Sequence, residues 1–345
     1  MLITNHFDKT VKTQALRQFF QNENLNFLLT NRIPRQFFTR WMGWFSQIRS
    51  PLLTRMSIAI WRLFTDLDLS DAKKQRFDSL HDCFTRELRT GAREIDTRPG
   101  ILASPSDAIV GACGHVIAGQ VFQAKGFPYV LSDLFGLSQN TAPFRDGVYV
   151  TLRLTSSMYH RFHAPHDCKA EHLTYISGDT WNVNPIALAR VQRLFCKNER
   201  AVLRLRLAQG GHPIALVPVA AILVASIRLH FLNVLLHLRY RGANEIACNA
   251  EFKKGQEMGW FQHGSTIIVF APKGFALAKG IQPGLTIKMG QALMQIPGKS
   301  HTSPPQTPLS PTRTASVVIK NSHRLHGNVT PLEHIAGGQH TKESP

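Results

Sequence analysis

The stretch Gly255–Pro272, GQEMGWFQHGSTIIVFAP, decides how the rest of the chain is interpreted. At its centre stands Gly264-Ser265-Thr266, and the β-branched, apolar run Ile267–Phe270 follows directly. A glycine-containing turn followed by such a run is typical of a loop that enters a buried strand. The pattern therefore predicts that Ser265 lies where a turn meets a strand. A base within reach would make its hydroxyl a nucleophile.

Gly-Ser-Thr alone is also a common turn sequence, so the surrounding residues decide its meaning. The segment Lys254–Gly259, KGQEMG, precedes it by a short interval. Together the two segments resemble the self-processing site of phosphatidylserine decarboxylase proenzymes. If the resemblance holds, the remaining motifs of that family should occur elsewhere in the chain, in the family's order.

The composition is that of a globular and strongly basic protein. The chain has 345 residues, of which 43% are hydrophobic, enough for one large domain or two small ones. Lys and Arg number 40 against 22 Asp and Glu, a formal net charge of +18. Such a chain is attracted to polyanions, either nucleic acid or an anionic membrane surface. The five scattered cysteines lack a CxxC pair, which favours reduced thiols over a disulfide framework or a zinc site.

The sequence lacks the pattern of a secretory signal or of a membrane-spanning segment. Asn5, Asp8 and Lys9 interrupt the N-terminus before any apolar region forms. The longest apolar run, Ile214–Ile227, is too short to cross a bilayer and contains Pro218. We interpret it as a pair of buried strands, and we expect a soluble or peripheral protein.

Apolar residues recur with helical spacing over residues 13–31, 35–49 and 51–64. In the second and third patterns, arginines flank an apolar face that contains tryptophans. Such a face is typical of a helix in a membrane interface, but also of a helical hairpin packed on its own protein, and both interpretations stay open. The face consists of Phe37, Phe38, Trp41, Trp44, Phe45, Ile48, Leu52, Met56, Ile60, Leu63 and Phe64, with Arg35, Arg40, Arg49, Arg55 and Arg62 beside it.

These patterns predict an α+β fold in three regions. Residues 1–96 form a helical N-terminal region that associates with a membrane surface, and its segment 66–96 is also expected to be helical. Residues 97–298 form a mostly antiparallel β catalytic domain, and residues 299–345 form a low-complexity, disordered tail. Expected strands are Ile109–Val110, His115–Val121, Gly147–Leu154, His172–Ile176, Ala201–Leu207, two within Ile214–Ile227, Thr266–Phe270, and two around a Gly290 turn in Leu285–Ile296. Short helices are expected at Ser132–Leu137 and Pro185–Leu188.

Two further segments carry candidate site residues. Asp107 lies in the turn SPSDA, residues 104–108, between two apolar runs, where an aspartate usually caps the turn. His160 and His163 lie in MYHRFHAP, residues 158–165, directly after a predicted strand. Two histidines suit a metal ion, but no third ligand or CxxC pair accompanies them, so we predict no metal site.

Both segments resemble motifs of the same decarboxylase family. SPSDA resembles its Pro-Ala-Asp-Gly turn, and YHRFHAP resembles its Tyr-His-Arg-x-His-x-Pro motif. Three more segments agree with the family's order: Leu80–Leu88, Gly178–Asn184 and Phe195–Arg200. On these motifs the chain is identified as a member of the phosphatidylserine decarboxylase proenzymes of bacterial type.

The resemblance implies two reactions at one site. In the first, His163, oriented by Asp107, takes the proton of Ser265, whose oxygen attacks the carbonyl of Gly264. The chain is cut into a β chain ending at Gly264 and an α chain beginning at Ser265, which becomes a covalent pyruvoyl group. In the second, this group accepts the amine of phosphatidylserine and acts as the electron sink while carbon dioxide leaves. His160 then returns a proton, and phosphatidylethanolamine is formed.

The resemblance also implies partners and a location. The substrate is phosphatidylserine in an anionic membrane, and the α and β chains of one precursor stay together. A homodimer is left open, and nucleic acid is not expected because no nucleic-acid-binding motif is present. The expected location is peripheral, on the cytoplasmic face of the inner membrane.

The sequence departs from the family at four positions. Ala108 stands for a glycine in the aspartate turn, and His263 stands for an apolar residue before the scissile glycine. Ala220 and Ala225 replace glycines in the long apolar run. His263 and Ala108 keep open a degenerate family member that is not processed. Ser265, His163 and Asp107 could also form an ordinary serine hydrolase that never cuts itself.

Overall fold

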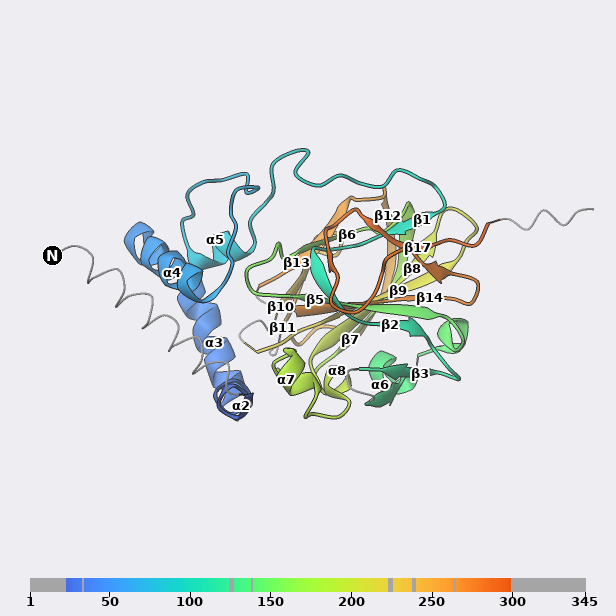
Figure 1. Ribbon diagram of the computed structural model, residues 1–345, viewed down its shortest axis with the longest axis horizontal. Helices are drawn as coiled ribbons and strands as arrows, with labels where there is room; N and C mark the ends of the chain where they lie inside the picture. The colour runs from blue at the N-terminus through green and yellow to red at the C-terminus, as the bar shows by residue number, and fades with distance from the viewer. Residues whose placement is uncertain are drawn as a thin grey trace, which may run out of the picture. The chain divides into compact units, whose positions relative to one another are not determined.

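Helices come first along the chain and antiparallel strands follow, as the sequence predicts (Figure 1). The computed structural model describes residues 23–298 except positions 33, 124–126, 138, 223–225, 238–239 and 263–264. The predicted tail 299–345, the first part of the helix expected at 13–31, and residues Ala225, His263 and Gly264 lie outside the described residues.

Three helices form the N-terminal part: α2 (Glu23–Asn31), α3 (Arg35–Ser46) and α4 (Pro51–Phe64). The start of α4 has strong local signals. Ser50 caps the helix by accepting a hydrogen bond from the Leu53 N–H, and Pro51 occupies the first turn, where its missing N–H is not needed. In Figure 1 these helices lie beside the strands rather than among them.

The segment 178–184 fixes α2 and α3 to the strands. Arg35 forms an ion pair with Asp179, with 2.6 Å between Nη2 and Oδ2. The Asn182 N–H donates to Asn31 Oδ1 at 3.1 Å. One of the segments that resembles the decarboxylase family therefore anchors the N-terminal helices.

The prediction of a helix over 66–96 is wrong for most of that segment. Only α5 (Leu80–Phe84) is helical there. The apolar residues of the pattern are buried, as Phe77 and Phe84 show, but Phe77 lies in an irregular loop and only Phe84 lies in α5. Polar side chains bond to the nearby backbone instead, as when Asp82 Oδ2 accepts from the Asp78 N–H, and such bonds compete with a continuous helix.

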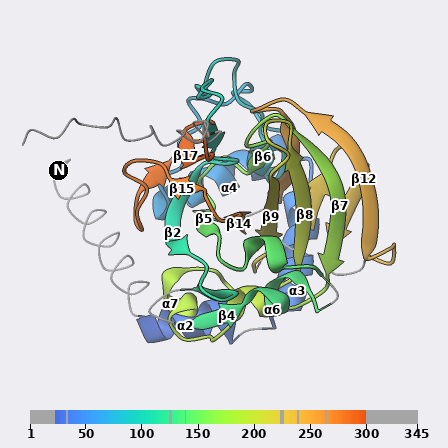
Figure 2. The same cartoon turned by 90° about the vertical axis from the view of Figure 1, so that its right-hand side faces the viewer.

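The main sheet has eight antiparallel strands in the order β12-β7-β8-β9-β14-β5-β2-β16, and Figure 2 shows it curving from β2 round to β12. A four-stranded sheet has the order β11-β10-β13-β6, a three-stranded one the order β1-β17-β15, and β3 pairs with β4. The bounds are β1 Ile101–Ala103, β2 Ala108–His115, β3 Gln120–Phe122, β4 Pro128–Val130, β5 Val148–Leu154, β6 Arg161–His163, β7 Cys168–Ile176, β8 Arg200–Leu207, β9 Pro213–Val219, β10 Ser226–Leu229, β11 Val234–His237, β12 Glu245–Phe252, β13 Glu257–Phe261, β14 Ser265–Ala271, β15 Ala276–Leu277, β16 Thr286–Ile287 and β17 Ala292–Gln295. The remaining helices are α6 Leu131–Phe135, α7 Pro185–Leu188, α8 Leu194–Lys197 and the 3-10 helix Ala142–Phe144.

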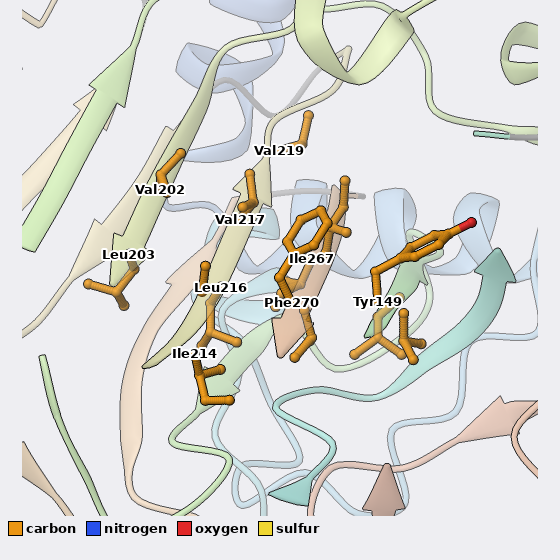
Figure 3. Packing of buried hydrophobic residues seen from close by; sticks show 14 of the residues in the cluster. Tyr149, Val202, Leu203, Ile214, Leu216, Val217, Val219, Ile267 and Phe270 are labelled. Carbon is orange, nitrogen blue, oxygen red and sulfur yellow. The ribbon is translucent and has the colours of Figure 1, made fainter. Parts of the chain in front are cut away.

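The core is built around β14, all of whose residues are buried. It pairs with β5 on one side and β9 on the other, so Ile268 faces Thr151 and Val217 in the two ladders. Figure 3 shows side chains of β8, β9, β14 and β5 packed beside one another. Each large aliphatic or aromatic side chain buried in this way contributes about 1.5–3 kcal/mol.

Most predicted strands are confirmed where the sequence has long apolar runs. The Ile214–Ile227 run forms two strands, β9 and β10, as expected, and 285–296 forms β16 and β17 around Gly290 at φ 91°. The expectation for 109–121 is wrong in detail, because one continuous strand ends at His115 and the next begins at Gln120. No strand was predicted at β1, β4, β6, β11 to β13 or β15, which are short or rich in polar residues.

Candidate active site

Ser265 is the first residue of β14, where the sequence pattern predicts it. Its register partner on β5 is Leu154. The side chain is fully buried, and its Oγ has no hydrogen-bond partner among the described atoms. An unpaired buried hydroxyl costs about 1–3 kcal/mol, so an orphan of this kind calls for a functional explanation.

His163, on β6, is buried and has both ring nitrogens in hydrogen bonds. Nδ1 lies 2.9 Å from the carbonyl oxygen of Gly255, and Nε2 lies 3.0 Å from the hydroxyl of Tyr159. Because a carbonyl oxygen can only accept, the proton of the neutral ring is on Nδ1, and Nε2 accepts from the tyrosine O–H. Burial lowers the pKa of His163, which favours this neutral form. The ring therefore presents a lone pair on Nε2.

Asp107 lies beside His163, but its carboxylate has other partners. The backbone N–H of His163 donates to the carbonyl of Pro105 at 2.8 Å, which brings the aspartate turn against β6. The carboxylate itself pairs with Arg93, with 2.9 Å between Nε and Oδ1 and 2.5 Å between Nη2 and Oδ2. It also accepts from the Met289 N–H at 2.9 Å. The structure thus joins Asp107 and His163 through the backbone, while the guanidinium of Arg93 holds the carboxylate.

Sequence reasoning did not find the partners of these two residues. Tyr159 belongs to the histidine motif, but no role was inferred for it. Arg93 precedes Asp107 by fourteen positions within an irregular part of the chain, where no spacing rule applies. Arg93 also pairs with Asp71 at 2.8 Å, so it links the aspartate turn to the loop before α5.

His160 is wholly buried and neutral. Burial, and secondarily the charge of Arg86, lower its pKa to about 3. Its Nδ1 lies 2.8 Å from the carbonyl oxygen of Met158, so Nδ1 carries the proton. Its Nε2 is buried and has no hydrogen-bond partner among the described residues. His160 therefore holds an unused lone pair in a dry environment.

The strand order brings His160 and Ser265 to the same end of the fold. The Phe261 N–H, at the end of β13, donates to the carbonyl of His160 at 2.9 Å. Ser265 begins β14 four residues later, and an extended chain of that length spans at most about 14 Å. His160 Nε2 and Ser265 Oγ, two buried atoms without a hydrogen-bond partner among the described residues, therefore lie in one region.

A cavity of about 620 Å³ adjoins this region. Helices α3, α4 and α5 line one side, and the end of β5 and the chain after β9 line the other. Phe84 of the lining meets the ring of His160 edge-on, at 5.9 Å between centroids. Leu154 of the lining is the register partner of Ser265. Neither His160 nor Ser265 belongs to the lining, but each has a direct neighbour in it.

Metal ligands and thiols are the other candidate reactive groups of the chain. In the described ranges, no three His, Cys, Asp or Glu side chains are grouped as metal ligands. All five cysteines are free, and burial raises the pKa of the Cys83 and Cys168 thiols to about 12. These two thiols are therefore neutral at physiological pH.

Comparisons with known proteins identify the family of the chain. A family model described as phosphatidylserine decarboxylase matches residues 80–295. Three similar relatives are each named phosphatidylserine decarboxylase proenzyme. The one from Psychromonas ingrahamii is 34% identical, covering 75% of this chain and 93% of the relative. The one from Erwinia tasmaniensis is 33% identical, covering 77% of this chain and 92% of the relative. The one from Marinobacter nauticus is 36% identical, covering 61% of this chain and 74% of the relative. The matched region spans well over half of the chain and contains all four candidate site residues, and so the chain belongs to the phosphatidylserine decarboxylase family.

Proposed function

We propose that this chain is the precursor of a pyruvoyl-dependent enzyme that converts phosphatidylserine to phosphatidylethanolamine. The precursor cuts itself between Gly264 and Ser265. The observation that carries the proposal is the buried hydroxyl of Ser265, which has no partner in the described part of the chain and begins the central strand of a family member.

In the self-cleavage, His163 is the base. Its Nε2 lone pair takes the proton of Ser265 Oγ when the Tyr159 hydroxyl moves aside, and the oxygen attacks the carbonyl carbon of Gly264. The peptide bond becomes an ester. Removal of the Ser265 α-proton then expels the Gly264 carboxylate. The dehydroalanine that remains takes up water, loses ammonia and becomes the pyruvoyl group.

Asp107 acts on His163 through its charge. Burial lowers the pKa of His163, and the Asp107 carboxylate is among the charges that oppose this effect. A negative charge nearby stabilises the imidazolium that forms when His163 takes the serine proton. The orientation of the ring comes from the Gly255 carbonyl, which fixes the proton on Nδ1.

The surroundings of Ser265 suit a pyruvoyl group. The residue is fully buried and paired with β5, so a new chain end there stays in the sheet. When formed, the group supplies an electron sink for the electrons left by departing carbon dioxide.

His160 moves a proton during the decarboxylation. With a pKa of about 3, lowered mainly by burial, it is neutral at physiological pH and carries no proton on Nε2 to give. The ammonium of the substrate must lose a proton before its nitrogen can react. We propose that the negative charge of the bound substrate raises the pKa of His160, so that Nε2 takes this proton and returns it to the carbon that loses carboxylate.

The helices α3 and α4 dock the enzyme peripherally on an anionic membrane at the cytoplasmic face of the inner membrane. Nine of their large apolar side chains are at least 36% exposed: Phe37, Phe38, Trp41, Trp44, Leu52, Met56, Ile60, Leu63 and Phe64. The arginines at positions 40, 49, 55 and 62 are exposed beside them. Tryptophan and arginine on one amphipathic surface suit the headgroup region of an anionic membrane. No helix in the described ranges is long and apolar enough to span a bilayer. The proposal does not depend on a homodimer.

The decisive experiment is the intact mass of the purified protein beside its Ser265→Ala variant. We expect two chains from the wild type, of which the C-terminal one is lighter by one ammonia than a chain starting with serine. The variant should remain whole. A whole wild-type chain would overturn the proposal. Labelling of that whole chain by a serine-directed fluorophosphonate would then identify a hydrolase, and absence of labelling an unprocessed family member.

A further inference from the structure

The cavity beside the candidate active site contains a single type of charge. Arg153, on β5, belongs to its lining, and no other described lining residue is charged. The remainder is apolar, as in Phe45, Trp61 and Phe84, or polar and neutral, as in Asn182. The cavity therefore has a positive group and no acid to balance it.

Arg153 differs from other arginines that are wholly or partly buried, because it has no partner among the residues that the structure describes. Arg86 and Arg200 donate to carbonyl oxygens, and Arg93 and Arg161 pair with carboxylates. Arg153 donates no hydrogen bond and forms no ion pair to any described residue, although it is partly buried. Burial lowers the pKa of Arg153, but a guanidinium keeps its proton at physiological pH. A charge taken from water without a partner is unfavourable unless a ligand supplies one.

The position of Arg153 relates it to Ser265. Arg153 pairs with Thr266 in the β5–β14 ladder, one position from the Leu154–Ser265 pair. Cα atoms of directly opposite residues in such a ladder are about 4.5–5.5 Å apart. Arg153 and Leu154, the register partner of Ser265, both line the cavity, so a ligand in the cavity lies close to the start of β14.

The chemistry of the cavity selects the ligand. A guanidinium offers a planar fork of donors that matches phosphate oxygens. The apolar walls suit hydrocarbon, and about 620 Å³ is within the usual range for a site that encloses a small molecule. The lining residue Ile60 is also 54% exposed and belongs to the apolar surface of α3 and α4. Hydrocarbon chains can thus pass from the cavity to that surface.

We propose that Arg153 binds the phosphodiester of the phospholipid substrate, with the serine end directed toward Ser265 and the acyl chains along α3 and α4. The inference rests on the proposed function and deepens it. The alternative anion on the same lipid is the serine carboxylate. An arginine on that group would stabilise the reactant more than the transition state, because the carboxylate charge disappears in the reaction. The phosphodiester keeps its charge throughout, so binding it helps the substrate and the transition state equally.

Uniform binding gives a specific kinetic signature. In the mature enzyme, Arg153→Met should raise KM for soluble dihexanoyl phosphatidylserine by about tenfold to hundredfold, the range for a lost bond to a charged group. The kcat should change by less than about threefold. Arg153→Lys should recover part of the affinity. O-hexyl serine, which has no phosphate, should react alike with the wild type and both variants.

Two controls separate this effect from general ones. Arg206→Met removes an exposed arginine paired with Glu171 on the sheet, and it should leave KM unchanged. Complete self-cleavage of Arg153→Met establishes that it folds. If Arg153→Met does not fold, the Arg153→Lys variant serves as the test. A lysine ammonium lacks the planar set of donors of the guanidinium, so KM for the phospholipid should still exceed that of the wild type. An unchanged KM in the folded variants, or an equal loss with O-hexyl serine, overturns the proposal.

A binding measurement keeps the inference separate from the proposed function. Calorimetry on the uncut Ser265→Ala precursor uses dihexanoyl phosphatidylglycerol, an anionic phosphodiester without an amine. Weaker binding when Arg153→Met is added supports the site, even if the wild type proves not to cut itself. Equal binding with and without Arg153 overturns the site, whatever the outcome for self-cleavage.

Discussion

Replacing Tyr159 by phenylalanine removes the hydroxyl that contacts His163 in the proposed self-cleavage site and leaves the ring in place. Tyr159 is 4% exposed, and its O–H donates to Nε2 of His163 at 3.0 Å. This bond exists only while the imidazole is neutral, because a protonated Nε2 has no lone pair to accept it. The hydroxyl therefore stabilises neutral His163, and its removal should raise the pKa of His163.

The size of the change follows from one hydrogen bond. A net contribution of about 1 kcal/mol corresponds to about 0.7 in pKa. Only neutral His163 can take the proton of Ser265, so the cleavage rate rises with pH through the pKa of His163 and then levels off. Burial lowers that pKa in the wild type, which places the midpoint below the ordinary value of 6.5. The Tyr159→Phe midpoint should lie about 0.7 pH units higher than the wild-type midpoint.

The assay follows single-turnover cleavage of precursor made by cell-free synthesis, over a range of pH, on denaturing gels. Tyr149→Phe is the matched control, since Tyr149 is a buried tyrosine whose hydroxyl donates instead to the Phe122 carbonyl at 3.2 Å. Its midpoint should equal that of the wild type. A Tyr159→Phe midpoint that stays in place or moves to lower pH would refute the assignment of the Nε2 lone pair as the base.

Two further predictions concern stability and the membrane. Burial raises the pKa of Glu199 from 4.5 to about 7. Between these pH values the folded chain holds a proton that the unfolded chain has lost, so the free energy of unfolding is highest below pH 4.5 and falls as the pH rises to 7. At pH 8, Glu199→Gln should therefore increase the free energy of unfolding by up to about 3 kcal/mol and raise Tm above that of the wild type. At pH 4.5 the two proteins should have nearly the same Tm. A Tm at pH 8 that does not exceed that of the wild type would contradict this prediction. Trp44→Ser, which removes a side chain 64% exposed on α3, should weaken sedimentation with anionic liposomes several-fold. Leu137→Ser, 88% exposed away from the helices, should not, and equal loss in both would argue against docking through α3.

The sequence predicts the centre of the fold better than its periphery. The strands β5, β9 and β14 consist of long β-branched and apolar runs that suit a buried position in any sheet. β6 has three residues, two of them Arg and His, and its strand geometry comes from pairing with β13 rather than from local preference. Tertiary pairing of this kind leaves no periodic signal in the sequence.

The segment 66–96 explains the other kind of error. Phe77, Leu80 and Phe84 are spaced as on one helix, and all three are buried. The helix ends at Phe84, however, and Leu88 forms an isolated bridge with Ala72 instead. Apolar residues at helical spacing indicate which side chains face the core. An irregular loop can bury the same side chains without forming a helix.

The candidate site shows the same division. Motifs find Ser265, His160 and His163, because local sequence around each is specific. The partner of Asp107 could not be found in this way. Arg93 reaches it from a loop whose path depends on contacts elsewhere, including the ion pair with Asp71.

The place of β14 in the main sheet has a consequence for the mature protein. If the chain is cut before Ser265, the new α chain begins with a strand that stays hydrogen-bonded to β5 and β9, both from the other fragment. Its later strands β16 and β17 pair with β2 and β1, also from the other fragment. The two fragments are thus interlocked, and separating them means unfolding both. After such a separation, reassembly would be a second-order process in which one strand must re-enter between two neighbours, so denatured mature enzyme should recover far more slowly than its uncut precursor.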